Sequence, residues 1–285
     1  MAPLRPTEGP TYKPHLLSRS GHSASVLGFV KVPVRLHGGQ SERLPLADGG
    51  TLTLHWWAEA RVPRRSTKPV VLILHGINNS SSTPYIQYIM RHLEQTGFES
   101  VCLNMRGHGK GNPIRSARQE PIVAGRGESS HVRGEWLGMR SGCRGRTGRR
   151  LSLEPLRVNA PRASSRFYTA RADDDVAAAV EHIACTRSPP KIFAIGFSMG
   201  ANQLLCFLGS SRSAALIDAA VSVSNPFDLS KIKVHFSSGV ARFYGAIIAQ
   251  PLKSMLWRGR HHLPLSREQF CSGMAATSVT QFDEN

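Results

Sequence analysis

Residues 191–200 read KIFAIGFSMG, an apolar run that ends in a Gly-x-Ser-x-Gly pattern at Gly196, Ser198 and Gly200. The run before Ser198 is typical of a buried strand, and ANQLLCFL after it favours a helix. A serine at such a turn has a strained backbone, and the two glycines let neighbouring chain approach closely. Its hydroxyl stands at the carboxyl edge of a sheet, where open α/β sheets bind ligands. We interpret Ser198 as a nucleophile, the alternative being a glycine-rich turn without chemistry.

A second apolar run, VVLILH at residues 70–75, is typical of a strand covered on both faces, and Gly76 ends it. The loop after such a strand can donate one backbone N–H to an oxyanion, and the residue after the nucleophile can donate another. Here those donors would be Ile77 and Met199, each worth about 10²–10³ in rate. We interpret the imidazole of His75 as structural.

Apolar spacing elsewhere predicts an α/β fold with a mostly parallel sheet and helices on both faces. Further strands are expected at 51–57, 100–104 and 219–224, and helices at 84–97, from 173 onward and at 236–257, the last as a cap. We divide the chain into an N-terminal arm, residues 1–45, and one domain, residues 46–285.

The formal net charge of +17 invites a nucleic-acid interpretation, but the charge is unevenly spread. Residues 110–166 hold 13 Lys or Arg against 4 Glu and interrupt the strand–helix rhythm. Their Arg and Gly bias predicts a disordered insertion. Because few aromatic residues accompany these charges, we expect no nucleic-acid partner.

The chain contains no run of 18 or more apolar residues, so no transmembrane segment is expected. The basic, acid-poor start leaves organelle targeting open beside a cytoplasmic location. Trp257 and the apolar residues near it allow peripheral contact with a membrane, the alternative being a place in the core or cap.

Several ordered blocks together resemble the α/β-hydrolase family of esterases and lipases that includes the embryogenesis-associated proteins. The blocks are YKPHLLSRSGH (12–22), VVLILHGINNSSSTPYIQYIMRHL (70–93), ESVCLNMRGHG (99–109), RFYTARADDDVAAAVEHI (166–183), KIFAIGFSMGANQLLCFLG (191–209) and AAVSVSNPFDL (219–229). The resemblance implies a serine hydrolase that cleaves short- or medium-chain acyl esters, acylglycerols or phospholipids through an acyl-enzyme. It implies neither a metal nor an organic cofactor.

The resemblance also implies a catalytic triad in the order Ser, Asp, His, with the last two residues after later strands. After the strand expected at 219–224 the sequence shows no further strands that could carry them, so we expect a domain shortened at its C-terminal end. Asp228 with His261 or His262 keeps the required order, although Asp228 also suits a structural turn. The alternative function is therefore a non-catalytic or truncated relative without the triad acid and histidine.

Overall fold

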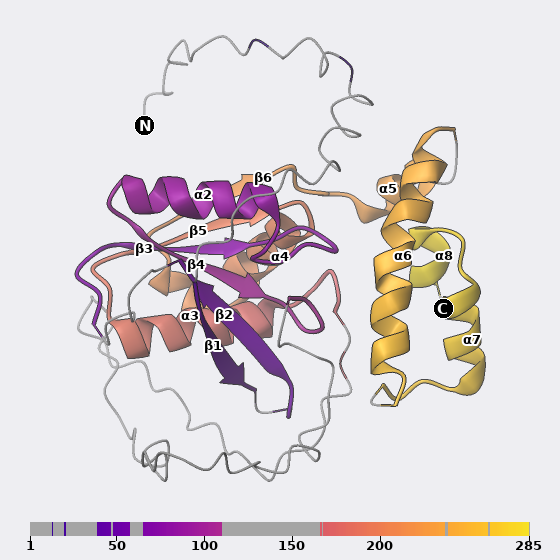
Figure 1. Cartoon of the computed structure of the whole chain (residues 1–285), viewed down its shortest axis with the longest axis horizontal. Helices are drawn as coiled ribbons and strands as arrows, with labels where there is room; N and C mark the ends of the chain where they lie inside the picture. The colour runs from indigo at the N-terminus through magenta and orange to yellow at the C-terminus, as the bar shows by residue number, and fades with distance from the viewer. Residues whose placement is uncertain are drawn as a thin grey trace. The chain divides into compact units, whose positions relative to one another are not determined.

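The structure is a computed structural model of the whole chain, drawn in Figure 1. It describes residues 39–46, 48–57, 65–109, 166, 168–236, 239–261 and 263–284, together with Lys13 and Ser20. The predicted insertion lies outside the described residues except at Arg166. The predicted arm does so too, except for those two single residues and its last seven positions.

Six strands and eight helices, one of them a short 3-10 helix, follow one another along the described residues. They are β1 (Gln40–Pro45), β2 (Thr51–Trp56), β3 (Val70–Leu74), α2 (Pro84–Gln95), β4 (Glu99–Asn104), α3 (Asp173–Arg187), β5 (Ile192–Phe197), α4 (Met199–Ser210), η3 (Arg212–Leu216), β6 (Ala219–Val223), α5 (Leu229–Phe236), α6 (Ala241–Gly259), α7 (Arg267–Ala275) and α8 (Val279–Asp283).

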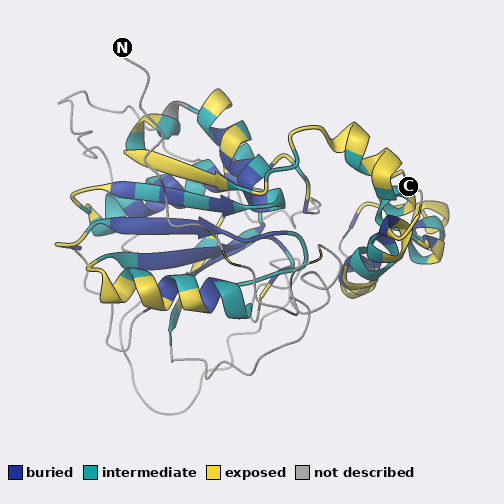
Figure 2. Ribbon diagram, turned by 90° about the horizontal axis from the view of Figure 1, so that it is seen from above, coloured by how far each residue is buried: buried dark blue, intermediate teal, exposed yellow. Residues whose placement is uncertain are grey.

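The strands form one sheet in the order β1-β2-β4-β3-β5-β6. Strands β3, β4, β5 and β6 run parallel, whereas β1 and β2 are antiparallel to their neighbours. All five residues of β3 are buried, as its uninterrupted apolar sequence predicts. The β6 edge is exposed instead, which Figure 2 shows in yellow.

Helices cover both faces of the sheet. On one face, Ile86 and Met90 of α2 pack against Val71 and Ile73 of β3. On the other face, α3 and α4 pack against the alternate residues of the strands, which include Leu72 and Leu74. Successive side chains of a strand point to opposite faces, so one apolar strand can serve both layers. The predicted fold of a mostly parallel sheet between helices is confirmed.

Local sequence explains where the two crossover helices begin and end. Pro84 stands in the first turn of α2, and Gly97 follows its end with φ 89°, a conformation that glycine adopts without steric cost. Three aspartates, 173–175, open α3, where carboxylates favour the helix dipole.

Strand β1 changes the predicted boundary between arm and domain. Residues 40–45 (QSERLP) pair antiparallel with β2, although we placed them in the arm. Their burial alternates between intermediate and exposed, as in an edge strand with few apolar residues. Such a strand gives a weak apolar pattern, which explains the difference.

The last four helices, α5 to α8, pack on one another. We expected one helix at residues 236–257, and the structure has α6 at 241–259, with α5 before it. A capping box formed by Ser266 and Gln269 begins α7. Within the described part of the chain, no helix is both long and apolar enough to span a membrane.

Candidate active site

Ser198 lies in the sharp turn between β5 and α4. Its backbone has φ 51° and ψ −117°, which is uncommon for a residue with a side chain. The N–H of Ser198 donates to the Val223 carbonyl at 2.9 Å, and its carbonyl accepts from the N–H of Ala201, also at 2.9 Å. Strain of this kind persists only where the surrounding structure enforces it. Ser198 is half-buried at the carboxyl end of β5.

The two motif glycines are required by close backbone contacts. A Cβ on Gly196 would lie 2.6 Å from the Ala201 Cα. A Cβ on Gly200 would lie 2.5 Å from the carbonyl oxygens of Leu74 and His75. Because real Cβ atoms do not approach backbone so closely, larger residues would push α4 away from β3 and β5.

The loop after β3 reaches the Ser198 turn. A Cβ on Gly76 would lie 3.3 Å from the Cβ of Ser198. The loop makes a turn from Gly76 to Asn79, closed by an N–H of Asn79 that donates to the Gly76 carbonyl at 3.2 Å. The Gly76 N–H itself donates to the hydroxyl of Tyr85 on α2, at 3.3 Å.

The N–H groups of Ile77 and Met199 make no hydrogen bond with the described residues. Met199 is the first residue of α4, where helix N–H groups have no partner within the helix. Unused N–H groups beside a serine hydroxyl suit stabilisation of an oxyanion. The structure thus brings Gly76, the residue before Ile77, against the turn that contains Met199.

The imidazole of His75 is fully buried, and both of its ring nitrogens meet backbone groups. Nδ1 lies 2.8 Å from the Gly76 carbonyl, and Nε2 accepts from the N–H of Met105 at 3.4 Å. Burial, together with the nearby His108, lowers the pKa of His75 to about 3. A neutral ring bonded in this way holds the ends of β3 and β4 together.

His108 was not among the site residues predicted from the sequence. It follows β4 in the Arg-Gly-His-Gly turn at residues 106–109. Its ring lies 5.1 Å from that of His75 and 4.5 Å from that of Tyr168, between centroids. Nδ1–H donates to the Arg106 carbonyl at 3.1 Å, while Nε2 is buried without a hydrogen-bond partner among the described residues. Burial lowers the pKa of His108 to about 4, so the ring is neutral.

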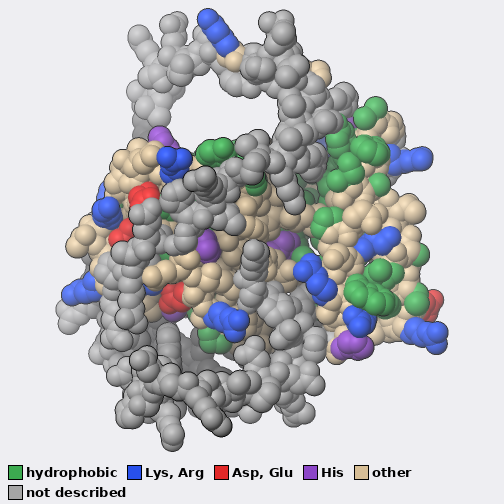
Figure 3. Space-filling view, viewed as in Figure 1, with side chains coloured by type: hydrophobic (Ala, Val, Ile, Leu, Met, Phe, Trp, Pro, Cys, Tyr) green, Lys and Arg blue, Asp and Glu red, His purple; other side chains and the backbone are tan. Residues whose placement is uncertain are grey.

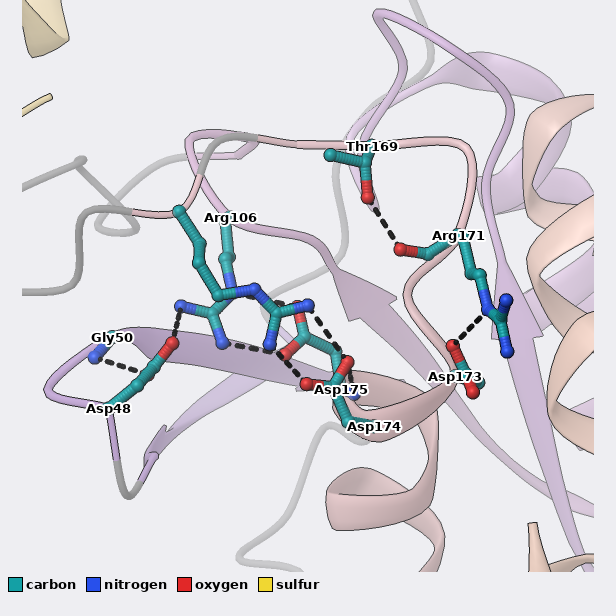
Figure 4. A network of polar contacts seen from close by, with 9 residues as sticks. Asp48, Gly50, Arg106, Thr169, Arg171, Asp173, Asp174 and Asp175 are labelled. Carbon is teal, nitrogen blue, oxygen red and sulfur yellow. Dashed lines mark hydrogen bonds and ion pairs between the residues drawn. The ribbon is translucent and has the colours of Figure 1, made fainter. Parts of the chain in front are cut away.

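A buried ion network holds the loops behind this site, as Figure 4 shows. Arg106 donates from Nε and Nη2 to the two carboxylate oxygens of Asp175, at 2.8 and 2.7 Å. Its Nη1 lies 2.8 Å from Oδ2 of Asp48, and the other carboxylate oxygen of Asp48 accepts from the N–H of Gly50. The network therefore joins the loop before β2, the end of β4 and the first turn of α3.

The structure does not join the proposed triad partners to Ser198. Asp228 is exposed and accepts hydrogen bonds from the N–H groups of Ser230 and Lys231, as a residue that begins α5 does. A hydrogen bond from the Ser230 hydroxyl, together with those from these N–H groups, lowers the pKa of Asp228. Among the described residues, no hydrogen bond links Asp228 to exposed His261, or either one to Ser198. His262 lies outside the described residues.

A search of the described residues for three or more His, Cys, Asp or Glu side chains that could share a metal ion finds no such group. The site as described consists of Ser198, two backbone N–H groups and the glycine-rich contacts around them.

The sequence model described as "alpha/beta hydrolase fold" matches residues 69–255, which is more than half of the chain. The chain belongs to the α/β-hydrolase family. The match includes β3, the loop with Ile77, and the Ser198 turn, so the fold class predicted from the sequence is confirmed.

Curated relatives are similar at low identity. The embryogenesis-associated protein EMB8 of Picea glauca is 25% identical over 75% of this chain and 38% of that protein. An abhydrolase domain-containing protein of Dictyostelium discoideum is 24% identical over 97% of this chain and 58% of that protein. A monoacylglycerol lipase of Saccharomyces cerevisiae is 25% identical over 70% of this chain and 34% of that protein. This chain spans between about a third and three fifths of these relatives' length.

Solved structures of esterases are also similar. The esterase Pf2001 of Pyrococcus furiosus has a TM-score of 0.45 and 14% identity, with 80% of each chain covered. Brefeldin A esterase has a TM-score of 0.39 and 14% identity over 89% of this chain and 62% of that chain.

Proposed function

We propose that this α/β hydrolase cleaves carboxylic esters, with Ser198 as the nucleophile. The observation that carries the proposal is the Ser198 turn: a positive φ, glycines that only fit without a Cβ, and unused N–H groups at Met199 and Ile77. These are the parts that acyl transfer requires, namely a presented hydroxyl and donors for the oxyanion.

In the proposed reaction the Ser198 hydroxyl oxygen attacks the ester carbonyl carbon. The carbonyl oxygen becomes an oxyanion, which the N–H groups of Ile77 and Met199 stabilise. The serine proton passes to a general base and then to the departing alcohol as the ester C–O bond breaks. Water attacks the resulting acyl-enzyme, releases the carboxylic acid and restores Ser198.

The general base separates the two candidate functions. Asp228 with His261 or His262 is one pair of residues that keeps the expected order. The second candidate is a non-catalytic relative, which binds esters without turning them over. It is favoured by one observation: the Ser198 hydroxyl has no histidine partner among the described residues. Without a base, oxyanion stabilisation and substrate binding alone leave a rate enhancement of only about 10³–10⁴ over the reaction in water.

The proposed substrates are short- or medium-chain acyl esters, acylglycerols or phospholipids. The relatives named monoacylglycerol lipase and phospholipase support this range at low identity. The proposal needs no metal ion or organic cofactor, because the attacking oxygen and the oxyanion donors all belong to the chain.

We further propose a cytoplasmic enzyme that touches a membrane surface through α5 and α6. Figure 3 shows hydrophobic side chains gathered over these helices, with Lys and Arg among them. Phe227, Val234 and Phe243 are 82%, 72% and 65% exposed. Residues 229–267 contain 7 Lys or Arg and no Asp or Glu. Lys231 and Lys233 pair with Asp228 and Glu284, and the remaining cations suit anionic lipid. Co-sedimentation with anionic vesicles that equals that with neutral vesicles would count against this contact.

Hydrolysis of p-nitrophenyl butyrate tests the proposed activity. We expect turnover by the wild type and none above background by Ser198→Ala at equal concentration of folded protein. Replacing His261 and His262 by Ala, one at a time, then asks which of them supplies the base. A folded wild type with no turnover above Ser198→Ala would favour the non-catalytic candidate.

A further inference from the structure

Asn78 stands directly after the proposed oxyanion donor Ile77, within the turn from Gly76 to Asn79. Its φ is 60°, a left-handed conformation that asparagine tolerates better than most residues with side chains. The hydrogen bond from the Asn79 N–H to the Gly76 carbonyl closes this turn, and Ile77 and Asn78 are its two central residues. A change in the conformation of Asn78 therefore alters the turn that orients the N–H of Ile77.

The side chain of Asn78 leaves the turn and binds the cap helix α6. Its Nδ2 donates to the carbonyl oxygen of Ile248 at 2.8 Å, across 170 residues of sequence. The amide orientation follows from the chemistry, because a carbonyl oxygen can only accept. The other amide atom, Oδ1, is buried and has no hydrogen-bond partner among the described residues. The contact with Ile248 is thus what orients this side chain.

One face of α6 is directed at this part of the domain. Met255, two turns after Ile248, is 3% exposed and belongs to the apolar cluster that contains Leu74 and Tyr168. Arg258, almost one turn further, is near enough for its charge to lower the pKa of His108. Positions spaced by three and seven residues share a helix face. The bond from Asn78 therefore reaches α6 where it faces the loops after β3 and β4.

Pro251 lies within α6, close to the contact with Asn78. A proline inside a helix has no N–H, so the carbonyl of Ile247, four residues earlier, loses its usual partner. The carbonyl that accepts from Asn78 belongs to Ile248, the next residue along the chain.

We infer that Asn78 is a positioning residue, whose amide fixes α6 against the turn that presents the Ile77 N–H. The inference rests on the proposed function, in which that N–H binds the oxyanion. The placement of α6 and the orientation of the donor are then coupled, and such coupling acts in both directions.

Variants of Asn78 separate the amide contact from the backbone conformation. Asn78→Gly permits the positive φ and removes the side chain, whereas Asn78→Asp keeps the size and replaces the donor by a carboxylate. Asn79→Ala is the matched control, because the Asn79 amide contacts Tyr85 on α2, at 3.4 Å, rather than α6. Met255→Ala loosens α6 from its other contact with the domain.

Hydrogen exchange of α6 and ester hydrolysis are measured for all variants. For Asn78→Gly and Asn78→Asp we expect exchange in residues 248–256 to accelerate about fivefold to tenfold, as loss of one hydrogen bond implies. We expect their kcat for p-nitrophenyl butyrate to fall about tenfold with KM changed less than twofold, because an oxyanion donor acts in the transition state. Asn79→Ala should change the exchange of residues 248–256 less than twofold, because the Asn79 amide contacts α2 and not α6.

Three results would overturn the inference. They are unchanged α6 exchange in both Asn78 variants, faster α6 exchange in the Asn78 variants with an unchanged kcat, and an equal acceleration of α6 exchange in Asn79→Ala. A wild type without turnover would contradict the proposed function and leave the coupling testable. Faster exchange of residues 76–82 in Met255→Ala would then support the coupling, and unchanged exchange there would refute it.

Discussion

Replacing Arg106 by Met should destabilise the domain strongly. The Arg106 side chain is 7% exposed and meets Asp175, itself 6% exposed, at 2.7 Å. Met keeps much of the apolar stem and removes the charge, which leaves the Asp175 carboxylate buried without its cation. Breaking one side of a buried pair costs about 3–5 kcal/mol.

Replacing either partner of Arg106 should lower the free energy of unfolding less than Arg106→Met does. Asp48 is 33% exposed, so Asp48→Asn should lower the free energy of unfolding by only about 0.5–1 kcal/mol. Asp175→Asn keeps its shape and leaves Arg106 paired with Asp48, so we expect a loss of about 1.5–3 kcal/mol, typical of one charged hydrogen bond.

Urea unfolding of the three variants measures this order. The double variant Arg106→Met/Asp175→Leu should recover part of the loss, because no unpaired charge remains buried. A loss below 1 kcal/mol for Arg106→Met, or an Asp48→Asn loss that equals it, would refute the electrostatic account of this network.

Three further predictions concern the core, its pH dependence and the insertion. Gly200→Ala should lower the free energy of unfolding by about 1–3 kcal/mol, because the added methyl group would meet backbone at 2.5 Å. Gly209→Ala, with nothing within 4 Å, should be neutral or stabilising by up to about 1 kcal/mol. Equal shifts in Tm for the two variants would contradict the steric argument. The pKa of Glu42 is lowered from 4.5 to about 2, mainly by the hydrogen bond from His182. The contribution of Glu42 to the free energy of unfolding is therefore present above pH 4.5 and is lost as the pH falls towards 2. Between pH 6 and 3 the wild type should therefore lose about 1–2 kcal/mol more unfolding free energy than Glu42→Gln, and parallel pH curves would exclude this. Replacing residues 111–165 by eight Gly and Ser residues should preserve cooperative unfolding under reducing conditions. The reason is that the rings of His108 and Tyr168, on either side of the segment, lie in contact with centroids 4.5 Å apart. A chain that no longer unfolds cooperatively would show that the core needs the segment.

The sheet could be predicted because its central strands are continuous apolar runs. VVLIL is buried throughout, as a strand covered on both faces is, whereas IFAIGF alternates between buried and half-buried residues although its sequence is continuously apolar. The glycines of the Ser198 turn could be predicted from the Gly-x-Ser-x-Gly pattern, although only the contacts of Gly196 are local and those of Gly200 reach Leu74 and His75 of a distant segment. Strand β1 was not predicted, because its QSERLP sequence is polar on an edge with little burial.

Long-range polar contacts left no local signal. Arg106 and Asp175 are 69 residues apart, and Asn78 and Ile248 are 170 apart. No periodicity connects such pairs, so only the folded chain shows that they meet. The capping box at Ser266 and Gln269 was different, because Ser-x-x-Gln is a recognisable signal for the start of a helix.

Labelling by a fluorophosphonate tests the central claim, that Ser198 is an activated nucleophile. The wild type and Ser198→Ala are treated with the probe, and the modified peptide is identified by mass spectrometry. We predict stoichiometric modification of Ser198 in the wild type, none at another serine, and none in Ser198→Ala. A folded wild type that stays unlabelled, or that is labelled at a different residue, would contradict the assignment.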